Sequence, residues 1–60
     1  MFQIEHRRAG SAIGRQFIRA SGLADALANA RLMAARLGAD QMTVTDATGG
    51  FIGVFQAGAI

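Results

Sequence analysis

Glu5 and His6 are adjacent and together suggest acid–base chemistry, because an imidazole titrates near neutral pH and a carboxylate can orient it. Both fall in a segment with strand-like alternation, where neighbouring side chains point to opposite faces of a sheet. The two groups then cannot act on one substrate atom, and we interpret them as a surface glutamate and a lone histidine. Ser11 and Ser21 have no base and orienting acid near them in sequence, and Ser21 is placed to cap a helix. We therefore predict no catalytic residue and expect that the protein is not an enzyme.

Residues that bind metals and cofactors are equally sparse. The chain has no cysteine, one histidine and four carboxylates, which excludes disulfides and thiolate zinc sites. Asp40 and Asp46 lack the spacing of a calcium-binding loop. Gly49, Gly50 and Gly53 join two predicted strands, whereas the glycines of a dinucleotide-binding motif lie between a strand and a helix. We expect no metal, no cofactor and no small-molecule substrate.

The basic residues are all arginines, and four of the six lie in the N-terminal third of the chain: Arg7, Arg8, Arg15 and Arg19. These side chains could contact phosphates, and Phe17 shares a strand face with Arg15 and Arg19, where it could stack on a base. The same arginines also suit a solvated loop and an edge strand protected against unwanted pairing. Nucleic-acid binding by this N-terminal hairpin is therefore an alternative function and not the leading one.

A single helix, predicted over residues 22–37, is the element around which the chain is arranged. Ser21 or Gly22 can cap its start, and Gly38 suits the left-handed residue that ends a helix. One broad apolar face is expected to lie on a sheet; it contains Leu23, Ala26, Leu27, Ala30, Met33, Ala34 and Leu37. The other side is polar except for a group that could seat a second helix, namely Ala24, Ala28, Leu32 and Ala35.

Two strands are predicted before the helix and two after it, over residues 1–6, 13–20, 41–46 and 51–57. The second has no wholly apolar face, which suits an edge strand or a strand with a bulge at Gly14. Residues 46–49 fit a type I turn between the last two strands. The fourth strand is apolar on both sides, with Phe51, Phe55 and Ala57 on one face and Ile52 and Val54 on the other. Such a strand is usually central in its sheet or buried in an interface.

These elements predict an α+β fold of the ββαββ type, with one helix packed on one face of a four-stranded, mainly antiparallel sheet. The pattern does not determine the strand order. The chain forms one small domain, residues 1–60, whose stability is marginal unless further surface is buried. With disulfides excluded and a structural metal not expected, oligomerisation is the remaining aid, and we predict a homo-oligomer, most simply a dimer.

Two surfaces compete as the oligomer interface. One is the fourth strand, through Phe51, Ile52, Val54 and Phe55; the other is the helix, through Ala28, Leu32 and Ala35. The strand offers the larger surplus of apolar surface, so it is the favoured route.

The location is predicted from patterns that the sequence lacks. No signal-peptide pattern follows Met1, and the longest apolar run, near the C-terminus, is interrupted by Gln56 and is too short to span a bilayer. We expect a cytoplasmic protein that does not contact membranes.

The layout resembles small uncharacterised bacterial ββαββ proteins, in which an Ala-rich helix precedes a V-x-D-x-x-G hairpin, here residues 44–49. That resemblance covers most of the chain and implies no known activity. Residues 24–31, with the sequence ADALANAR, are also similar to the helix of HicB-like antitoxins, which implies toxin binding and oligomerisation. Antitoxins of that type carry three strands and a turn with Pro and Gly before the helix, whereas this chain has two predicted strands there and no proline.

Overall fold

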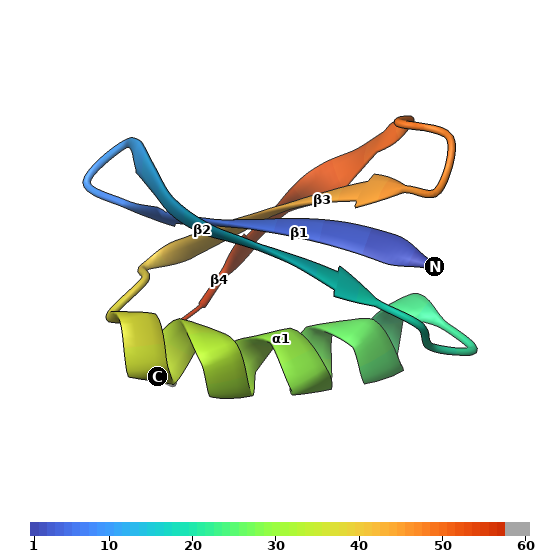
Figure 1. Cartoon of the computed structure of the whole chain (residues 1–60), viewed down its shortest axis with the longest axis horizontal. Helices are drawn as coiled ribbons and strands as arrows, with labels where there is room; N and C mark the ends of the chain where they lie inside the picture. Colours follow the sequence, from blue (N-terminus) through green and yellow to red (C-terminus); the bar gives the residue numbers. More distant parts are fainter. Residues whose placement is uncertain (58–60) are drawn as a thin grey trace.

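Two β-hairpins flank one helix in the computed structural model, which describes residues 1–57 (Figure 1). The strands are β1 (Phe2–Arg8), β2 (Ser11–Ile18), β3 (Gln41–Asp46) and β4 (Phe51–Gln56), and the helix is α1 (Leu23–Leu37). Neighbouring strands are antiparallel throughout, in the order β2-β1-β3-β4. Figure 1 shows α1 on one side of this twisted sheet. The predicted ββαββ fold of the α+β class is confirmed.

The ends of α1 follow the predicted signals. The helix begins after Gly22, which is extended, and ends at Gly38, whose φ of 75° is left-handed. The backbone N–H groups of Gly38 and Ala39 both donate to the carbonyl of Ala34, which satisfies the last turn. The cap residue is therefore Gly22, and the Ser21 hydroxyl instead donates to the Asp25 carboxylate over 3.1 Å.

The first hairpin is tighter than predicted. β1 continues to Arg8, and a turn of two residues, Ala9 and Gly10, leads into β2, which begins and ends two residues before the expected range. Both turn residues have positive φ, 51° and 83°, the arrangement that matches the twist of a two-residue hairpin. The carboxylate of Asp40 accepts a hydrogen bond from the Ala9 N–H over 3.1 Å and helps to hold this turn.

β2 is an edge strand, as its sequence predicts, and it has a bulge one residue before the predicted position at Gly14. His6 pairs with Gly14 and Arg7 with Ala12, so Ile13 is the extra residue. Gly14 lies beneath the end of the helix, and a Cβ atom on it would stand 2.8 Å from Leu37 Cδ1. The lack of a side chain at Gly14 therefore lets the edge strand and the helix C-terminus approach closely.

A second bulge, in β4, reverses one predicted side-chain direction. Val44 pairs with Gly53 and Thr45 with Phe51, which leaves Ile52 as the extra residue. Phe51 therefore points to the face opposite Phe55, not to the same face, because a bulge changes the alternation by one position. β4 also lies at an edge of the sheet and not at its centre. The turn before it closes as predicted, with the Gly49 N–H donating to the Asp46 carbonyl over 3.1 Å.

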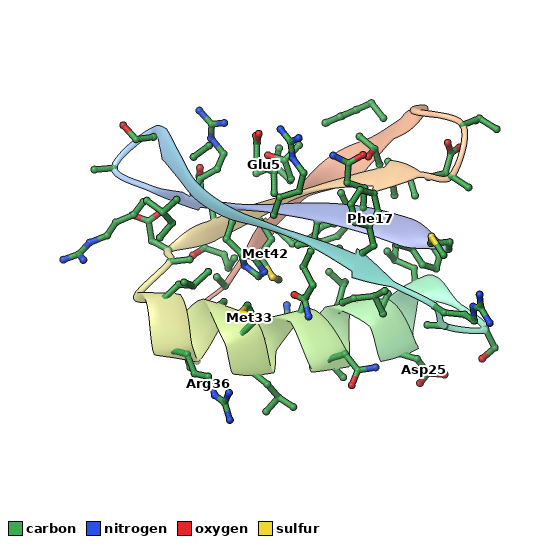
Figure 2. The ribbon with its side chains drawn as sticks, in the orientation of Figure 1. Glu5, Phe17, Asp25, Met33, Arg36 and Met42 are labelled. Carbon is green, nitrogen blue, oxygen red and sulfur yellow. The ribbon has the colours of Figure 1, made fainter. Side chains whose placement is uncertain are left out.

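The core lies between α1 and the two central strands. Its fully buried side chains are Ile4, His6, Ala26, Ala30, Ala34, Met42 and Val44. The three alanines form the line of the helix closest to the sheet, whereas the predicted core leucines Leu23, Leu27 and Leu37 flank it and are half-buried. In Figure 2, Met33 and Met42 lie between the helix and the sheet, while Arg36 and Asp25 point to the far side of the helix.

Candidate interaction surfaces

The open face is our name for the side of the sheet turned away from α1, as seen for Glu5 in Figure 2. The pairing register places its side chains in two cross-strand rows: Phe17, Gln3, Thr45 and Phe51, then Arg15, Glu5, Thr43 and Val54. Three of these are apolar and exposed: Phe17 at 65%, Phe51 at 68% and Val54 at 52%. Within residues 1–57 no element covers this face.

The four candidate interface residues of β4 do not all lie on one face of the sheet. Phe51 and Val54 are on the open face, and Ile52, the bulge residue between them, is 36% exposed. Phe55 lies on the opposite face, across from Met42, where it is half-buried and packs against the core. Phe17, for which base stacking was predicted, lies on the open face in the same cross-strand row as Phe51.

Charges on the open face are mixed in sign. Glu5 lies between two arginines: Arg7 Nη1 is 2.7 Å from Glu5 Oε1, and Arg15 Nη2 is 3.7 Å from Glu5 Oε2. Arg7 also donates to the carbonyl of Gly10. The carboxylate partly neutralises both cations, and their position on the same face follows from their alternate positions on paired strands.

The four N-terminal arginines do not form one patch. Arg7 and Arg15 are beside Glu5 on the open face. Arg8 belongs to the other face of β1, and its Nη1 would stand 3.5 Å from a Cβ on Gly38 at the C-terminal end of α1, where a cation is favourable. Arg19 follows β2 and lines a groove beside the helix.

The edge groove is our name for that depression, a space of about 440 Å³ between β2 and α1. It is lined by residues 16–19 from the strand side and by Asn29, Leu32, Met33 and Arg36 from the helix. Two of these residues, Arg19 and Arg36, are exposed cations, and no carboxylate of residues 1–57 lines the groove. The edge groove is therefore positively charged.

The outer helix face holds the remaining interface candidates. Ala28, Leu32 and Ala35 are all exposed, and Leu32 is 70% exposed. Leu32 is also part of the edge groove. Because Ala28 and Ala35 beside it are small, the Leu32 side chain is accessible to a partner.

His6, interpreted from the sequence as a lone histidine, is fully buried in the core on the same face of β1 as Ile4. Its neighbour Glu5 does point to the opposite face, as predicted, and the two cannot act together. His6 Nε2 lies 2.9 Å from Gln16 Oε1, while Nδ1 has no hydrogen-bond partner within residues 1–57. The alternation that puts His6 on the same face as Ile4 was the signal for burial. Gln16, which holds the imidazole, was missed because only the register places it opposite Ile4 and beside His6.

One carboxylate has a perturbed titration. The hydroxyl of Thr48 donates to Asp46 Oδ1 over 2.7 Å, and the backbone N–H groups of Gly50 and Thr48 donate to the same oxygen over 2.7 and 2.9 Å. These hydrogen bonds, led by the one from the Thr48 hydroxyl, lower the pKa of Asp46 below its usual 3.8. These hydrogen bonds hold the turn between β3 and β4.

No cluster of three or more metal-binding side chains occurs among residues 1–57. No helix there is both long and apolar enough to cross a bilayer.

Comparison of the sequence with protein-family models, and of the chain with curated proteins and solved structures, gives no match.

Proposed function

We propose that this protein is a non-enzymatic module that associates with a second copy of itself through the open face of its sheet. The observation that carries the proposal is the exposure of Phe17 and Phe51, each about two-thirds accessible, on a sheet face that no described element covers. Aromatic side chains contribute strongly to interfaces because they bury large areas at low entropic cost.

The size of the patch suits a dimer. Together with Val54 and Ile52, the two phenylalanines expose roughly 400 Å² of apolar surface, in two groups at the edges of the sheet that Gln3 and Thr45 separate. Two copies would contribute about 800 Å², close to the apolar share of a standard interface.

The geometry of the open face is self-complementary. Phe17 and Phe51 lie at opposite edges of one cross-strand row, separated by Gln3 and Thr45. A two-fold axis parallel to the strands places Phe17 of one copy over the partner's Phe51, and it does so twice. Sheets packed in this way lie about 10 Å apart, which is the reach of two facing aromatic side chains.

The modest core supports the same conclusion. Of the fully buried side chains, only Ile4, Met42, His6 and Val44 are larger than alanine, and one of these is polar. A domain of this size gains little from its own core, so burial of the open face against a partner would stabilise the fold.

The outer helix face is the weaker route to a dimer. Leu32 is the one large apolar side chain of that candidate set, and Arg36 and Arg31 are exposed on the same helix. Two copies joined there would bring these arginines together and bury less apolar surface.

Nucleic-acid binding by the N-terminal hairpin gains no support from the positions of its arginines. Arg7 and Arg15 share one carboxylate, and Arg8 and Arg19 lie elsewhere. The test of that alternative is salt-sensitive binding of DNA or RNA at about 50 mM salt that is lost in Arg7→Ala/Arg8→Ala.

The mass in solution tests the dimer. We expect light scattering at micromolar concentration to give twice the 6.3 kDa chain mass. Phe51→Glu should raise the dissociation constant at least about 100-fold and give a monomer, since it places a charge in the apolar contact with the partner's Phe17. Leu32→Glu is the matched control, because it removes an equally exposed side chain from the helix.

Two results would contradict the proposal. A monomer mass for the unchanged protein defeats self-association altogether. A dimer that survives Phe51→Glu but dissociates in Leu32→Glu assigns the interface to the helix.

A further inference from the structure

We infer that the edge groove binds an extended, acidic segment of another protein, which adds to the sheet as a strand beside β2. This surface is separate from the self-association surface proposed above, and the inference does not depend on dimer formation.

The free edge of β2 provides the backbone contacts. Within the described part of the chain, β1 is the only strand that pairs with β2, so the other edge of an eight-residue strand has no strand neighbour. Such an edge presents N–H and C=O groups that an incoming strand can satisfy. The residues of β2 nearest the groove, from Gln16 to Ile18, form the end of this edge.

The wall of the edge groove is held in place. Gln16 is fixed by its contact with the buried imidazole of His6, and Ile18 is only 6% exposed. The opposite wall belongs to α1, through Leu32 and Met33. A groove between a strand edge and a packed helix receives an extended peptide with little rearrangement, which lowers the entropic cost of binding.

The charge of the groove selects the partner. Arg19 and Arg36 are exposed on its two sides, and no described carboxylate accompanies them there. Two copies of this surface would repel each other, so the occupant is a different chain that carries negative charge. In an added strand, alternate side chains face the helix side, toward Arg36, and the intervening ones face the side of Phe17 and Arg19, so acidic groups on either side can approach an arginine of the groove.

A peptide is favoured over a nucleic acid for two reasons. The free strand edge can form a backbone ladder only with another polypeptide. The groove also has Phe17 as its one aromatic residue, whereas nucleic-acid grooves stack successive bases on several.

The experiment uses a defined probe, a fluorescein-labelled ten-residue peptide of alternating valine and glutamate, with fluorescence anisotropy as the readout. We expect saturable binding that weakens with added salt. The double variant Arg19→Gln/Arg36→Gln should weaken binding about tenfold or more, because it removes both cations of the groove. Arg8→Gln/Arg31→Gln removes the same charge outside the groove and should change binding less than about twofold.

Two further peptides separate the contribution of backbone hydrogen bonds from that of charge. A peptide in which prolines replace alternate valines lacks N–H donors for a ladder and should bind at least about tenfold more weakly. A peptide of alternating valine and lysine should not bind, since it carries the charge of the groove.

The inference is overturned if the acidic probe does not bind at about 100 µM, or if both double variants weaken it equally. It is also overturned if a ten-nucleotide thymidine oligonucleotide binds more tightly than the peptide and loses binding in Arg19→Gln/Arg36→Gln, which would assign the groove to nucleic acid. The dimer mass of each variant, measured in parallel, reports on the proposed self-association independently.

Discussion

The open face and the edge groove meet at β2 but differ in shape and charge. The open face carries apolar side chains at both edges and a carboxylate between two arginines. The edge groove is concave and carries two arginines without a described carboxylate. A surface of mixed charge can face its own copy, whereas a surface of one sign requires a partner of the opposite sign. Charge balance therefore supports the proposal that the two surfaces bind different partners.

Gln16→Leu gives the largest effect that we expect on the stability of the fold. It compares a polar residue that lines the edge groove with one on the open face. The change removes the partner of a fully buried imidazole, and an unsatisfied buried polar group costs about 1–3 kcal/mol. Urea denaturation measures this loss in the free energy of unfolding.

Two controls accompany Gln16→Leu. Gln3→Leu makes the same substitution on the open face, opposite Phe17, and should leave the free energy of unfolding of the monomer nearly unchanged. The double variant His6→Leu/Gln16→Leu removes both polar groups and should recover stability relative to Gln16→Leu. Equal stability of Gln16→Leu and the unchanged protein would show that this hydrogen bond contributes nothing.

Phe17→Ser tests where the two surfaces overlap. Phe17 lies on the open face and also lines the edge groove, so we expect both dimer formation and binding of the acidic peptide to weaken, each about tenfold, or 1.4 kcal/mol. Phe51→Glu should weaken dimer formation alone, because Phe51 does not line the groove. If Phe17→Ser leaves one of the two activities intact, the surfaces are more separate than the structure indicates.

Asp46→Asn gives the smallest effect, and it concerns the turn that leads into Phe51 on the open face. The pKa of Asp46 is lowered in the folded state by hydrogen bonds from Thr48 and Gly50, so its contribution to stability is present above the unfolded pKa of about 4. That contribution is lost as the pH falls through the lower folded pKa.

The measurement for Asp46 is urea denaturation of both proteins at several pH values. Asp46→Asn should be less stable than the unchanged protein at pH 7, and the difference should shrink in acid. A difference that does not depend on pH would show that the charge of this carboxylate has no part in the turn.

Much of this fold could be predicted from local sequence. The helix boundaries follow from Gly22, Gly38 and the helix-forming residues between them, and the turn at residues 46–49 follows from Asp46 and Gly49. The edge position of β2 follows from its lack of an apolar face. In each case the determining residues lie within a few positions of one another.

The rest depends on residues that are distant in the sequence. The bulge at Ile52 is defined by pairing with β3, and it moves Phe51 to the open face without any change in local pattern. The edge groove joins residues from β2 and the middle of α1, so no sequence motif describes it. The burial of His6 was indicated by its alternation with Ile4, but a histidine alone is a weak core signal.

The strand order has a consequence for the time course of folding. β1 pairs with β2 across a turn of two residues. Its other edge pairs with β3, which is separated from β1 in the sequence by all of β2 and α1. Both hairpins and the helix can form from nearby residues, whereas the pairing of β1 with β3 closes the largest loop in the sheet. We therefore expect that pairing to limit the folding rate. The two hairpins, cut apart within the helix, should each remain unfolded and become ordered only when mixed.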